Sequence, residues 1–397
     1  MSTTQYTPSL NVSGLNVATT SESTDLISQG GSLAPSTSNA AVIQQWIKKT
    51  TGQIAVTPGV TPYWANAFLY STISITATGT NAYEGGIVLP DGRVIFIPCN
   101  AQNVGTFNPI TNSFTTVAFT GTAGATIPGG SGAYLGGCLS PDGRIVFASY
   151  NATNVGFFNP VTNSFSTLAT GTYSGKFVGA TVIPGGQILF TPCDAAAYGI
   201  YNTNTNLFTT TGITGVPASA IYQGAGVVHP NGNVYFPPFT ATNIGIYNTN
   251  TNSFTTFSGV TTGGYFGGVL LPDGRIVFVP ATATNLGLFN PSTNSYTTFS
   301  GAGPGGGTTF AGGVLLGDGR IFLAPCTTTY GLIYNPSANS LTTITGFPGI
   351  STYVGLSLLP DGRIILCPST SSTVGVLSGQ NFSVTGDLCL HPFFNKF

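Results

Sequence analysis

The residue types that do chemistry are scarce in this chain, and most of the charged ones recur in a single motif. Each of the five arginines follows an Asp-Gly pair: Arg93, Arg144, Arg275, Arg320 and Arg363. Aspartates gathered in this way on one face would make a candidate ligand or metal site. In the alternative interpretation, Asp and Gly supply turn geometry and the arginine pairs with a nearby carboxylate. We favour the alternative, because exposed ion pairs contribute only about 0–1 kcal/mol and imply no function.

The other acid–base and ligand-type residues form no recognisable catalytic or metal-binding set. The two histidines, His229 and His391, lie in unrelated contexts. The acids outside the turns do not recur as a glycosidase-like pair; they are Glu22, Asp25, Glu84, Asp194 and Asp387. The sequence also lacks a calcium-loop pattern, a glycine-rich phosphate loop and a plausible Ser-His-Asp set. It therefore predicts a protein that is not an enzyme and has no metal or cofactor.

The six cysteines do not have the pattern of a disulfide framework. Cys99, Cys193 and Cys326 occupy equivalent positions in repeats that are not neighbours, too far apart for the Cα separation of a disulfide. The remaining three occur in dissimilar contexts. We therefore predict buried free thiols, as expected of a protein made in a reducing compartment.

The Asp-Gly-Arg motif marks one turn of a longer repeat. Two further copies keep the glycine without the charges, at Gly186 and Gly232, and the seven turns recur every 42–51 residues. A period in this range is typical of propeller repeats. Asp-Gly between two apolar runs predicts a β-hairpin with a type I′ turn, in which both central residues have positive φ. A second hairpin follows around residues 290–294, so each module is predicted to contain four antiparallel strands.

The hydrophobic patterns indicate how these modules pack. Residues 94–97 and 276–279 are nearly continuous apolar runs, which predicts strands buried on both faces. The outer run at residues 113–116 alternates and is rich in Thr, as an exposed edge strand would be. Buried inner strands and polar outer edges result when blades stack radially around an axis. The predicted fold is an all-β, seven-bladed β-propeller.

The order of these elements resembles the kelch-repeat propellers over residues 81–387. The corner is similar to the kelch Asp-Pro-x-Thr-Asn-x-Trp pattern, and here it reads Asn290-Pro291-Ser292-Thr293-Asn294-Ser295-Tyr296. The family's second diglycine is replaced by pairs such as Pro98-Cys99, and its tryptophan by Phe or Tyr. The resemblance implies a kelch-like architecture without implying a kelch partner. Copper-radical chemistry, which some kelch-like propellers perform, needs a His and Tyr ligand cluster that two unrelated histidines do not supply.

Asparagines of the Asn-x-Gly type recur at the start of the third strand: Asn103, Asn154, Asn243 and Asn285. They could line one face as sugar-binding amides, beside the aromatic residues Tyr150, Phe239 and Tyr330. In the alternative, each asparagine simply opens its strand with an Asx turn, and we favour this interpretation.

Residues 1–80 differ in kind from the repeats, and residues 388–397 form a short tail. Residues 40–49 predict a short amphipathic helix with Val42, Ile43, Trp46 and Ile47 on one face. About two turns of helix must dock on something to be stable. The helix and the second tryptophan, Trp64, would either pack on the propeller or anchor the chain to a partner. Residues 69–76 resemble a fourth strand, and either they or residues 381–385 complete the last blade.

The composition narrows the classes of function. Only 5% of residues are charged and the net charge is −1, which argues against binding to nucleic acid or anionic membranes. There is no secretory signal and no apolar stretch long enough to insert into a bilayer.

We therefore expect a non-enzymatic structural protein of a virion or particle surface, made in the cytoplasm and anchored through its arm to other structural proteins or to copies of itself. The alternative is a lectin-like propeller that binds a cell-surface glycan beside Tyr150 and Phe239. An enzyme on a propeller scaffold is a third hypothesis, which would require an acid pair or a cofactor.

Overall fold

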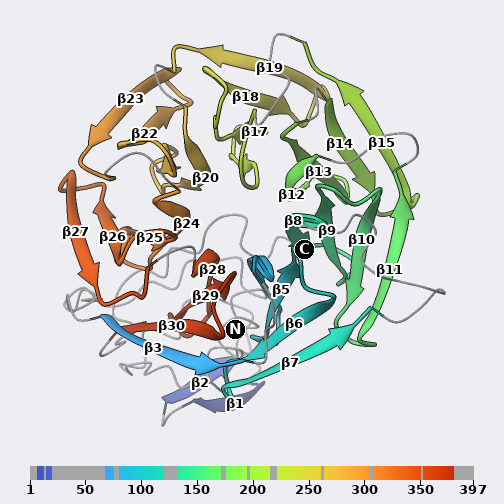
Figure 1. The fold of residues 1–397 in the computed structure, drawn as a ribbon, viewed down its shortest axis with the longest axis vertical. Helices are drawn as coiled ribbons and strands as arrows, with labels where there is room; N and C mark the ends of the chain where they lie inside the picture. The colour runs from blue at the N-terminus through green and yellow to red at the C-terminus, as the bar shows by residue number, and fades with distance from the viewer. Residues whose placement is uncertain are drawn as a thin grey trace, which may run out of the picture.

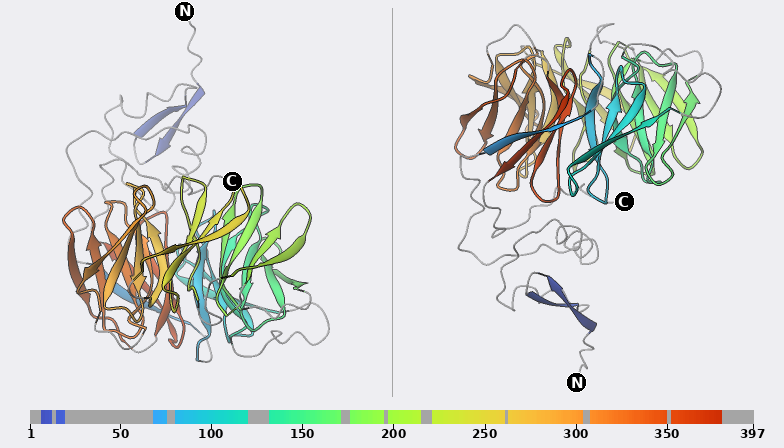
Figure 2. Two further views of the ribbon diagram at one scale, coloured as in Figure 1. Left: turned by 90° about the horizontal axis from the view of Figure 1, so that it is seen from above. Right: turned by 60° about the horizontal axis from the view of Figure 1, so that its bottom comes forward.

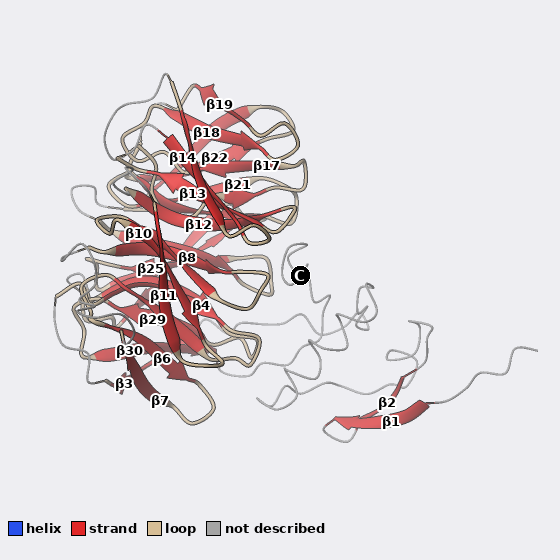
Figure 3. Ribbon diagram, turned by 90° about the vertical axis from the view of Figure 1, so that its right-hand side faces the viewer, coloured by secondary structure: helices blue, strands red, loops and turns tan. Residues whose placement is uncertain are grey.

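The computed structural model describes eleven stretches of the chain, and these contain β-strands and no helix (Figures 1 and 3). The described residues are 7–12, 15–19, 68–75, 80–119, 132–170, 176–194, 197–214, 221–260, 263–303, 308–349 and 352–379. Within them, no helix could span a membrane. The predicted helix at residues 40–49 and the arm residues Val42, Ile43, Trp46, Ile47 and Trp64 lie outside the described residues.

Seven four-stranded antiparallel sheets are arranged radially as the blades of a propeller, confirming the predicted fold (Figure 1). Blade 1 is β4 (Tyr83–Val88), β5 (Val94–Pro98), β6 (Asn103–Asn108) and β7 (Ser113–Ala118). Blade 2 is β8 (Tyr134–Leu139), β9 (Ile145–Ser149), β10 (Asn154–Asn159) and β11 (Ser164–Ala169). Blade 3 is β12 (Phe177–Ile183), β13 (Gln187–Pro192), β14 (Ala197–Asn202) and β15 (Leu207–Gly212). Blade 4 is β16 (Val227–Val228), β17 (Asn233–Phe236), β18 (Asn243–Asn248) and β19 (Ser253–Ser258).

The remaining blades repeat this order. Blade 5 is β20 (Tyr265–Leu270), β21 (Ile276–Pro280), β22 (Asn285–Asn290) and β23 (Ser295–Ser300). Blade 6 is β24 (Phe310–Leu315), β25 (Ile321–Pro325), β26 (Tyr330–Asn335) and β27 (Ser340–Thr345). The first strand of each blade lies nearest the axis, and the ring seen from the side is a disc (Figures 1 and 2). Two strands near the N-terminus, β1 (Thr7–Val12) and β2 (Leu15–Thr19), pair with each other.

The last blade combines the two ends of the repeat region. Its strands β28 (Tyr353–Leu358), β29 (Ile364–Pro368) and β30 (Thr373–Gly379) are completed by β3 (Phe68–Ser74), which pairs antiparallel with β30 (Figure 1). The hydroxyl groups of Tyr70 and Tyr353 are 2.6 Å apart, and the Tyr70 ring packs on Phe347. Of the two segments that the sequence left open, the N-terminal one is the outer strand of this blade.

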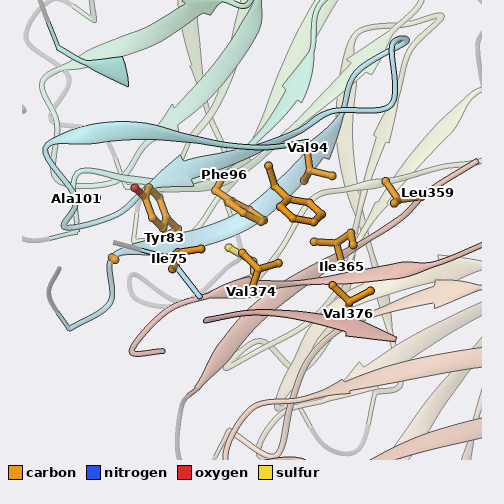
Figure 4. Close-up of a cluster of buried hydrophobic side chains, with 12 residues drawn as sticks. Ile75, Tyr83, Val94, Phe96, Ala101, Leu359, Ile365, Val374 and Val376 are labelled. Atoms are coloured by element: carbon orange, nitrogen blue, oxygen red, sulfur yellow. The ribbon is translucent and has the colours of Figure 1, made fainter. Parts of the chain in front are cut away.

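The hydrophobic core consists of seven layers, one between each pair of neighbouring blades. Figure 4 shows the layer that joins blade 7 to blade 1, where Val94 and Phe96 face Ile365, Val374 and Val376. The second strands are buried along their whole length, as the continuous apolar runs predicted. The outer strands alternate between half-buried and exposed residues. Neighbouring blades therefore hold one another through inner strands that are apolar on both faces.

The Asp-Gly hairpins form, but the type I′ turn expected for them is wrong. In blade 1 the Gly92 N–H donates to the Leu89 oxygen at 2.9 Å and the Leu89 N–H donates to the Arg93 oxygen at 2.8 Å. Gly92 has φ of 88°, whereas Asp91 is not in the positive-φ region. This geometry is a type I turn followed by a left-handed glycine. Pro90 fits the first central position of this turn, since its ring holds φ near −65°. The same turn also forms in blade 6, where Gly317 replaces the proline, so the proline is compatible with this geometry without being required for it.

The Asn-x-Gly asparagines do not open Asx turns, which was the interpretation favoured from the sequence. Their side-chain oxygens instead accept hydrogen bonds from a buried tyrosine at or just before the start of the first strand of the same blade. These pairs are Tyr83 with Asn103, Tyr134 with Asn154, Tyr222 with Asn243 and Tyr265 with Asn285. In blade 3 the aromatic residue is Phe177, which has no hydroxyl, and Ala197 replaces the asparagine. The asparagines thus satisfy buried hydroxyl groups.

The Tyr134–Asn154 pair makes this role testable. Asn154→Ala should lower the free energy of unfolding by roughly 1–3 kcal/mol, because it leaves the fully buried Tyr134 hydroxyl without an acceptor. Adding Tyr134→Phe should recover part of that loss, since the double variant copies the Phe177 and Ala197 arrangement of blade 3. Chemical denaturation of both single variants and the double variant measures the coupling. Additive losses would show that the hydrogen bond is unimportant.

Closure of the ring through β3 gives a second prediction. A chain that begins at residue 67 keeps β3 and should unfold like the full-length protein. A chain that begins at residue 76 lacks the partner of β30 and the Tyr70 contacts. We expect its Tm to fall by roughly 10 °C or more, because several kcal/mol of packing are lost. Equal Tm values for the two truncated chains, measured by calorimetry, would contradict this account of closure.

Candidate functional site

The two faces of the disc differ in charge. In an antiparallel blade the turn between the first and second strands lies at one face, and the loop between the second and third strands lies at the other. The five Asp-Gly-Arg turns therefore share one face, which we call the turn face. In each, the arginine Nη2 lies 2.7–2.8 Å from the aspartate Oδ2 two residues earlier. The other three charged residues of the described ranges, Glu84, Lys176 and Asp194, lie toward the opposite loop face.

The paired arginines also connect neighbouring blades. Arg93 donates to the Pro160 oxygen of blade 2 at 3.3 Å, and Arg363 donates to the Pro109 oxygen of blade 1 at 2.9 Å. Blade 4 has no arginine, and there His229 Nε2 lies 3.0 Å from the Gly274 oxygen of blade 5. The Asp-Gly-Arg residues thus form turns and local ion pairs, as favoured from the sequence. Some of their arginines also hydrogen-bond to the next blade. No group of three His, Cys, Asp or Glu side chains within the described ranges is placed to hold a metal ion.

A cavity of about 230 Å³ lies where the first strands converge on the axis. Its wall is largely glycine backbone and apolar side chains, including Ile97, Val178, Phe266, Val354 and Leu356. The blades meet so closely here that a Cβ on Gly355 would lie 2.8 Å from the Gly85 Cα. Glycine is therefore required for the inner strands to approach each other this closely. The cavity between them, which we call the axial channel, is narrow because of that approach.

Among the described residues, Glu84 is the only titratable side chain in the wall of this cavity. It follows Tyr83 in β4, at a position held in the other blades by Leu135, Val178, Gln223, Phe266, Ala311 and Val354. Within the described part of the protein its carboxylate has no hydrogen-bond or ion-pair partner, and the residue is only partly exposed, toward the cavity. Burial raises the pKa of Glu84 to about 7, because the apolar wall disfavours the ionised form.

A polar cluster lies at the loop face around blades 2 and 3. The Tyr150 hydroxyl donates to Asp194 Oδ2 at 3.0 Å, and the Lys176 ammonium lies 4.5 Å from the Tyr150 ring centroid and donates to Asn151 Oδ1 at 2.8 Å. Burial and the bond to Asp194 raise the pKa of Tyr150 to about 12, and the Glu84 charge contributes. Glu84 lies near the start of β4 and Tyr150 follows the end of β9, so the topology of the blades places both at the loop face.

The three aromatic residues predicted to line a ligand face belong to this loop face. Tyr150 follows β9, Phe239 follows β17 and Tyr330 begins β26, so topology places all three at the end where the second strands finish. Tyr150 is engaged by Lys176 and Asp194, and the Tyr330 ring contacts Phe310 edge-on with centroids 6.0 Å apart. They share a face, but none of the three lines the axial cavity.

The described cysteines are free thiols, as predicted. Burial raises the pKa of Cys99 and Cys193 to about 12 and that of Cys326 to about 11, with the Glu84 charge adding to the effect. The pKa of Cys367, whose Sγ lies 3.3 Å from the Gly85 oxygen, is also raised by burial. Thiols in this state are weak nucleophiles at neutral pH.

The sequence did not point to Glu84 as a site residue, because the search was for pairs of acids and for residues that recur from blade to blade. The signal for Glu84 is instead that it differs from its equivalents in the other blades. Glu84 is the single acid at a position that carries apolar residues in five of the other six blades and Gln223 in blade 4. In a repeat protein, a residue that departs from its equivalents in this way is a candidate for function.

Comparisons with known proteins identify the fold but no family. No model of a known protein family matches the chain, and neither does any curated protein sequence. Among solved structures, a streptogramin B lyase matches with 15% identity and a TM-score of 0.66, covering 79% of this chain and 98% of that one. A catalytically inactive histidine-to-alanine variant of virginiamycin B lyase from Staphylococcus aureus, with quinupristin, matches at 17% identity and a TM-score of 0.66 over 79% and 99% of the two chains. A WD40 β-propeller domain matches at 16% identity and a TM-score of 0.60 over 79% and 98%.

These matches contradict the expectations that the chain is not an enzyme and that it is a virion or particle surface component. The matched lyases are enzymes built on the same fold, so the absence of a familiar motif does not argue against catalysis. Nor do the matches support the glycan-binding alternative. At 15–17% identity they show a shared propeller fold, and the activity of this chain must be inferred from its own residues.

The raised pKa of Glu84 predicts how stability depends on pH. The folded protein holds the Glu84 proton between its unfolded pKa near 4.5 and its folded pKa near 7, so stability should fall as pH rises through this window. Glu84→Gln removes the cost of ionisation and should be more stable than the natural chain at pH 8, by at most roughly 2–3 kcal/mol. The two proteins should differ little at pH 4. Denaturation at both pH values checks this, and an equal difference at both would contradict it.

Proposed function

We propose that the axial channel is the functional site of a propeller that processes a small molecule, and that Glu84 is its proton-exchanging group. The observation that carries this proposal is a partnerless carboxyl group set in an apolar channel wall. A buried carboxyl without a partner costs free energy in the ionised form and is retained where it has a use.

The chemistry of this position suits general acid–base catalysis. With a pKa of about 7, Glu84 is present in both protonation states at neutral pH, which is the condition under which a carboxyl group both accepts and donates protons efficiently. The apolar wall limits the water that competes for the proton. A cavity of about 230 Å³ is small compared with drug-sized pockets, so it suits a small ligand or a narrow part of a larger one.

The matched lyases supply a reaction type that this site could perform. A lyase eliminates a group without adding water, and elimination needs a base to remove a proton. One matched structure is inactive after loss of a histidine. In the present chain His229 lies on the turn face, bonded to Gly274 and accepting from the Asn231 N–H, and is not available to the channel. Among the described residues, Glu84 is therefore the base that we assign to this chain; His391 lies outside them.

We also infer that the repeats are kelch-like at the outer corner. Asn290 Oδ1 accepts hydrogen bonds from the backbone N–H groups of Ser292 and Thr293, and Asn294 takes the left-handed conformation with φ of 51°. The residues that resemble the kelch corner thus have a turn-forming role here. This supports a shared local architecture and implies nothing about a partner.

The proposed role of Glu84 can be tested directly because the chain contains only two glutamates, Glu22 and Glu84. Carbon-13 labelling of glutamate should give two carboxyl NMR signals. We expect the signal that titrates near pH 7 to vanish in Glu84→Gln and to remain in the matched control Glu22→Gln. An ordinary carboxyl titration for Glu84 would overturn the proposal.

Turnover is measured alongside the titration, with quinupristin as the first compound tried and its consumption followed by liquid chromatography and mass spectrometry. If turnover occurs, its rate should rise with pH through about 7 and fall by roughly 100-fold or more in Glu84→Gln, as is usual for loss of a general base. A Glu84→Gln protein that turns over substrate at the natural rate would contradict the assignment.

A further inference from the structure

The electrostatic balance at the channel indicates the charge of its ligand. The five turn-face arginines are each paired with an aspartate, so they contribute no net charge. No basic side chain lines the cavity. At the loop face Lys176 is held by the Tyr150 ring and Asn151, and it forms no ion pair with Glu84. The channel therefore presents one carboxylate whose countercharge the described part of the protein does not provide.

The wall supplies a second contact of the kind that organic cations favour. Phe266 of β20 lines the same cavity as Glu84, is partly exposed and contacts no aromatic ring of the described residues. An aromatic face attracts an ammonium ion, and the attraction grows when water is excluded. Val178, Val354 and Leu356 in the same wall can pack against an alkyl chain.

The other titratable groups that interact with Glu84 remain neutral over the range in which it ionises. They are the thiols of Cys99, Cys193, Cys326 and Cys367 and the phenol of Tyr150. Burial raises the pKa of Cys99, Cys193 and Tyr150 to about 12 and that of Cys326 to about 11, and it raises the pKa of Cys367 well above the ordinary thiol value. These groups therefore stay uncharged while Glu84 ionises. The charged groups at the rim are Lys176 and Asp194. Only Glu84 changes the charge of the channel wall in this interval.

We propose that the axial channel binds a small alkylammonium ion, with the Glu84 carboxylate as its counter-ion and the Phe266 ring as its second contact. This inference rests on the proposed function of the channel and names the class of its ligand. Ion pairing satisfies the carboxylate that the fold leaves alone, and the apolar wall strengthens the pairing because it lowers the local dielectric constant. A neutral analogue of the same shape lacks the ion pair with Glu84, and an anionic analogue is repelled by the Glu84 carboxylate.

The test uses the full chain labelled with carbon-13 glutamate and titrated with n-butylammonium chloride, n-butanol or sodium butyrate at constant ionic strength. We expect butylammonium to shift the Glu84 signal and lower its apparent pKa, and the other two probes to bind at least 10-fold more weakly. Affinity should rise about 10-fold per pH unit below pH 7 and level off above it, because only ionised Glu84 pairs with the ammonium group.

Variants identify the residues responsible. Calorimetry should show that Glu84→Gln abolishes butylammonium binding and that Phe266→Ala weakens it by roughly 3- to 30-fold. Asp194→Asn is the matched control, because it removes an acid from the same face outside the channel wall and should leave binding unchanged. Binding that survives Glu84→Gln, or that is lost only in Asp194→Asn, would overturn the inference.

The outcomes separate this inference from the proposed function. If Glu84 titrates near pH 7 but butylammonium does not shift its signal, the ligand class is wrong and the proton-exchange role stands. If Glu84 titrates as an ordinary carboxyl group, the proton-exchange role fails. In that case ammonium binding that depends on Glu84 would still support the inference.

Discussion

Pairing of β3 with β30 is the constraint on which the rest of the molecule depends. Seven blades can enclose an axis only if the last is joined firmly to the first, and here one blade is built from both ends of the repeat region. The layer between blades 7 and 1 is then as apolar as the other six. Because every inner strand is packed from both sides, the first strands are held close to the axis and their backbones form the channel wall. The cavity that we propose as the functional site is thus a consequence of closure.

The few charged residues that the structure describes differ between the two faces of the disc. On the turn face they are paired locally, and arginines such as Arg93 and Arg363 add hydrogen bonds to the next blade. A pair of exposed charges contributes little, but a charge that also bonds across a blade boundary helps to set the angle between blades. On the loop face, Glu84 remains without a local partner. The division of charge distinguishes the face that stabilises the ring from the face on which we propose that a ligand binds.

Function in a repeat protein depends on the places where the repeats differ. Positions that serve the fold recur from blade to blade, as the buried tyrosines and their asparagine acceptors do in four of the seven blades. Glu84 occurs once, and so does the cluster of Tyr150, Lys176 and Asp194. The matched lyases show that this fold occurs in enzymes, and the role that we propose for Glu84 rests on its own position in the cavity wall.

The sequence by itself determined the elements of this protein, because they depend on local chemistry. Turn residues at a regular period and apolar runs such as residues 94–97 were enough to predict seven four-stranded blades with buried inner strands, and the positions of the cysteines were enough to predict free thiols. The tertiary structure decided whatever depends on contacts between distant residues. Asn154 proved to be the acceptor for Tyr134 twenty residues away, and β3, rather than residues 381–385, is the closing strand. Glu84 and Phe266 are far apart in sequence, and they line one cavity only because closing the ring brings blades 1 and 5 to a common axis.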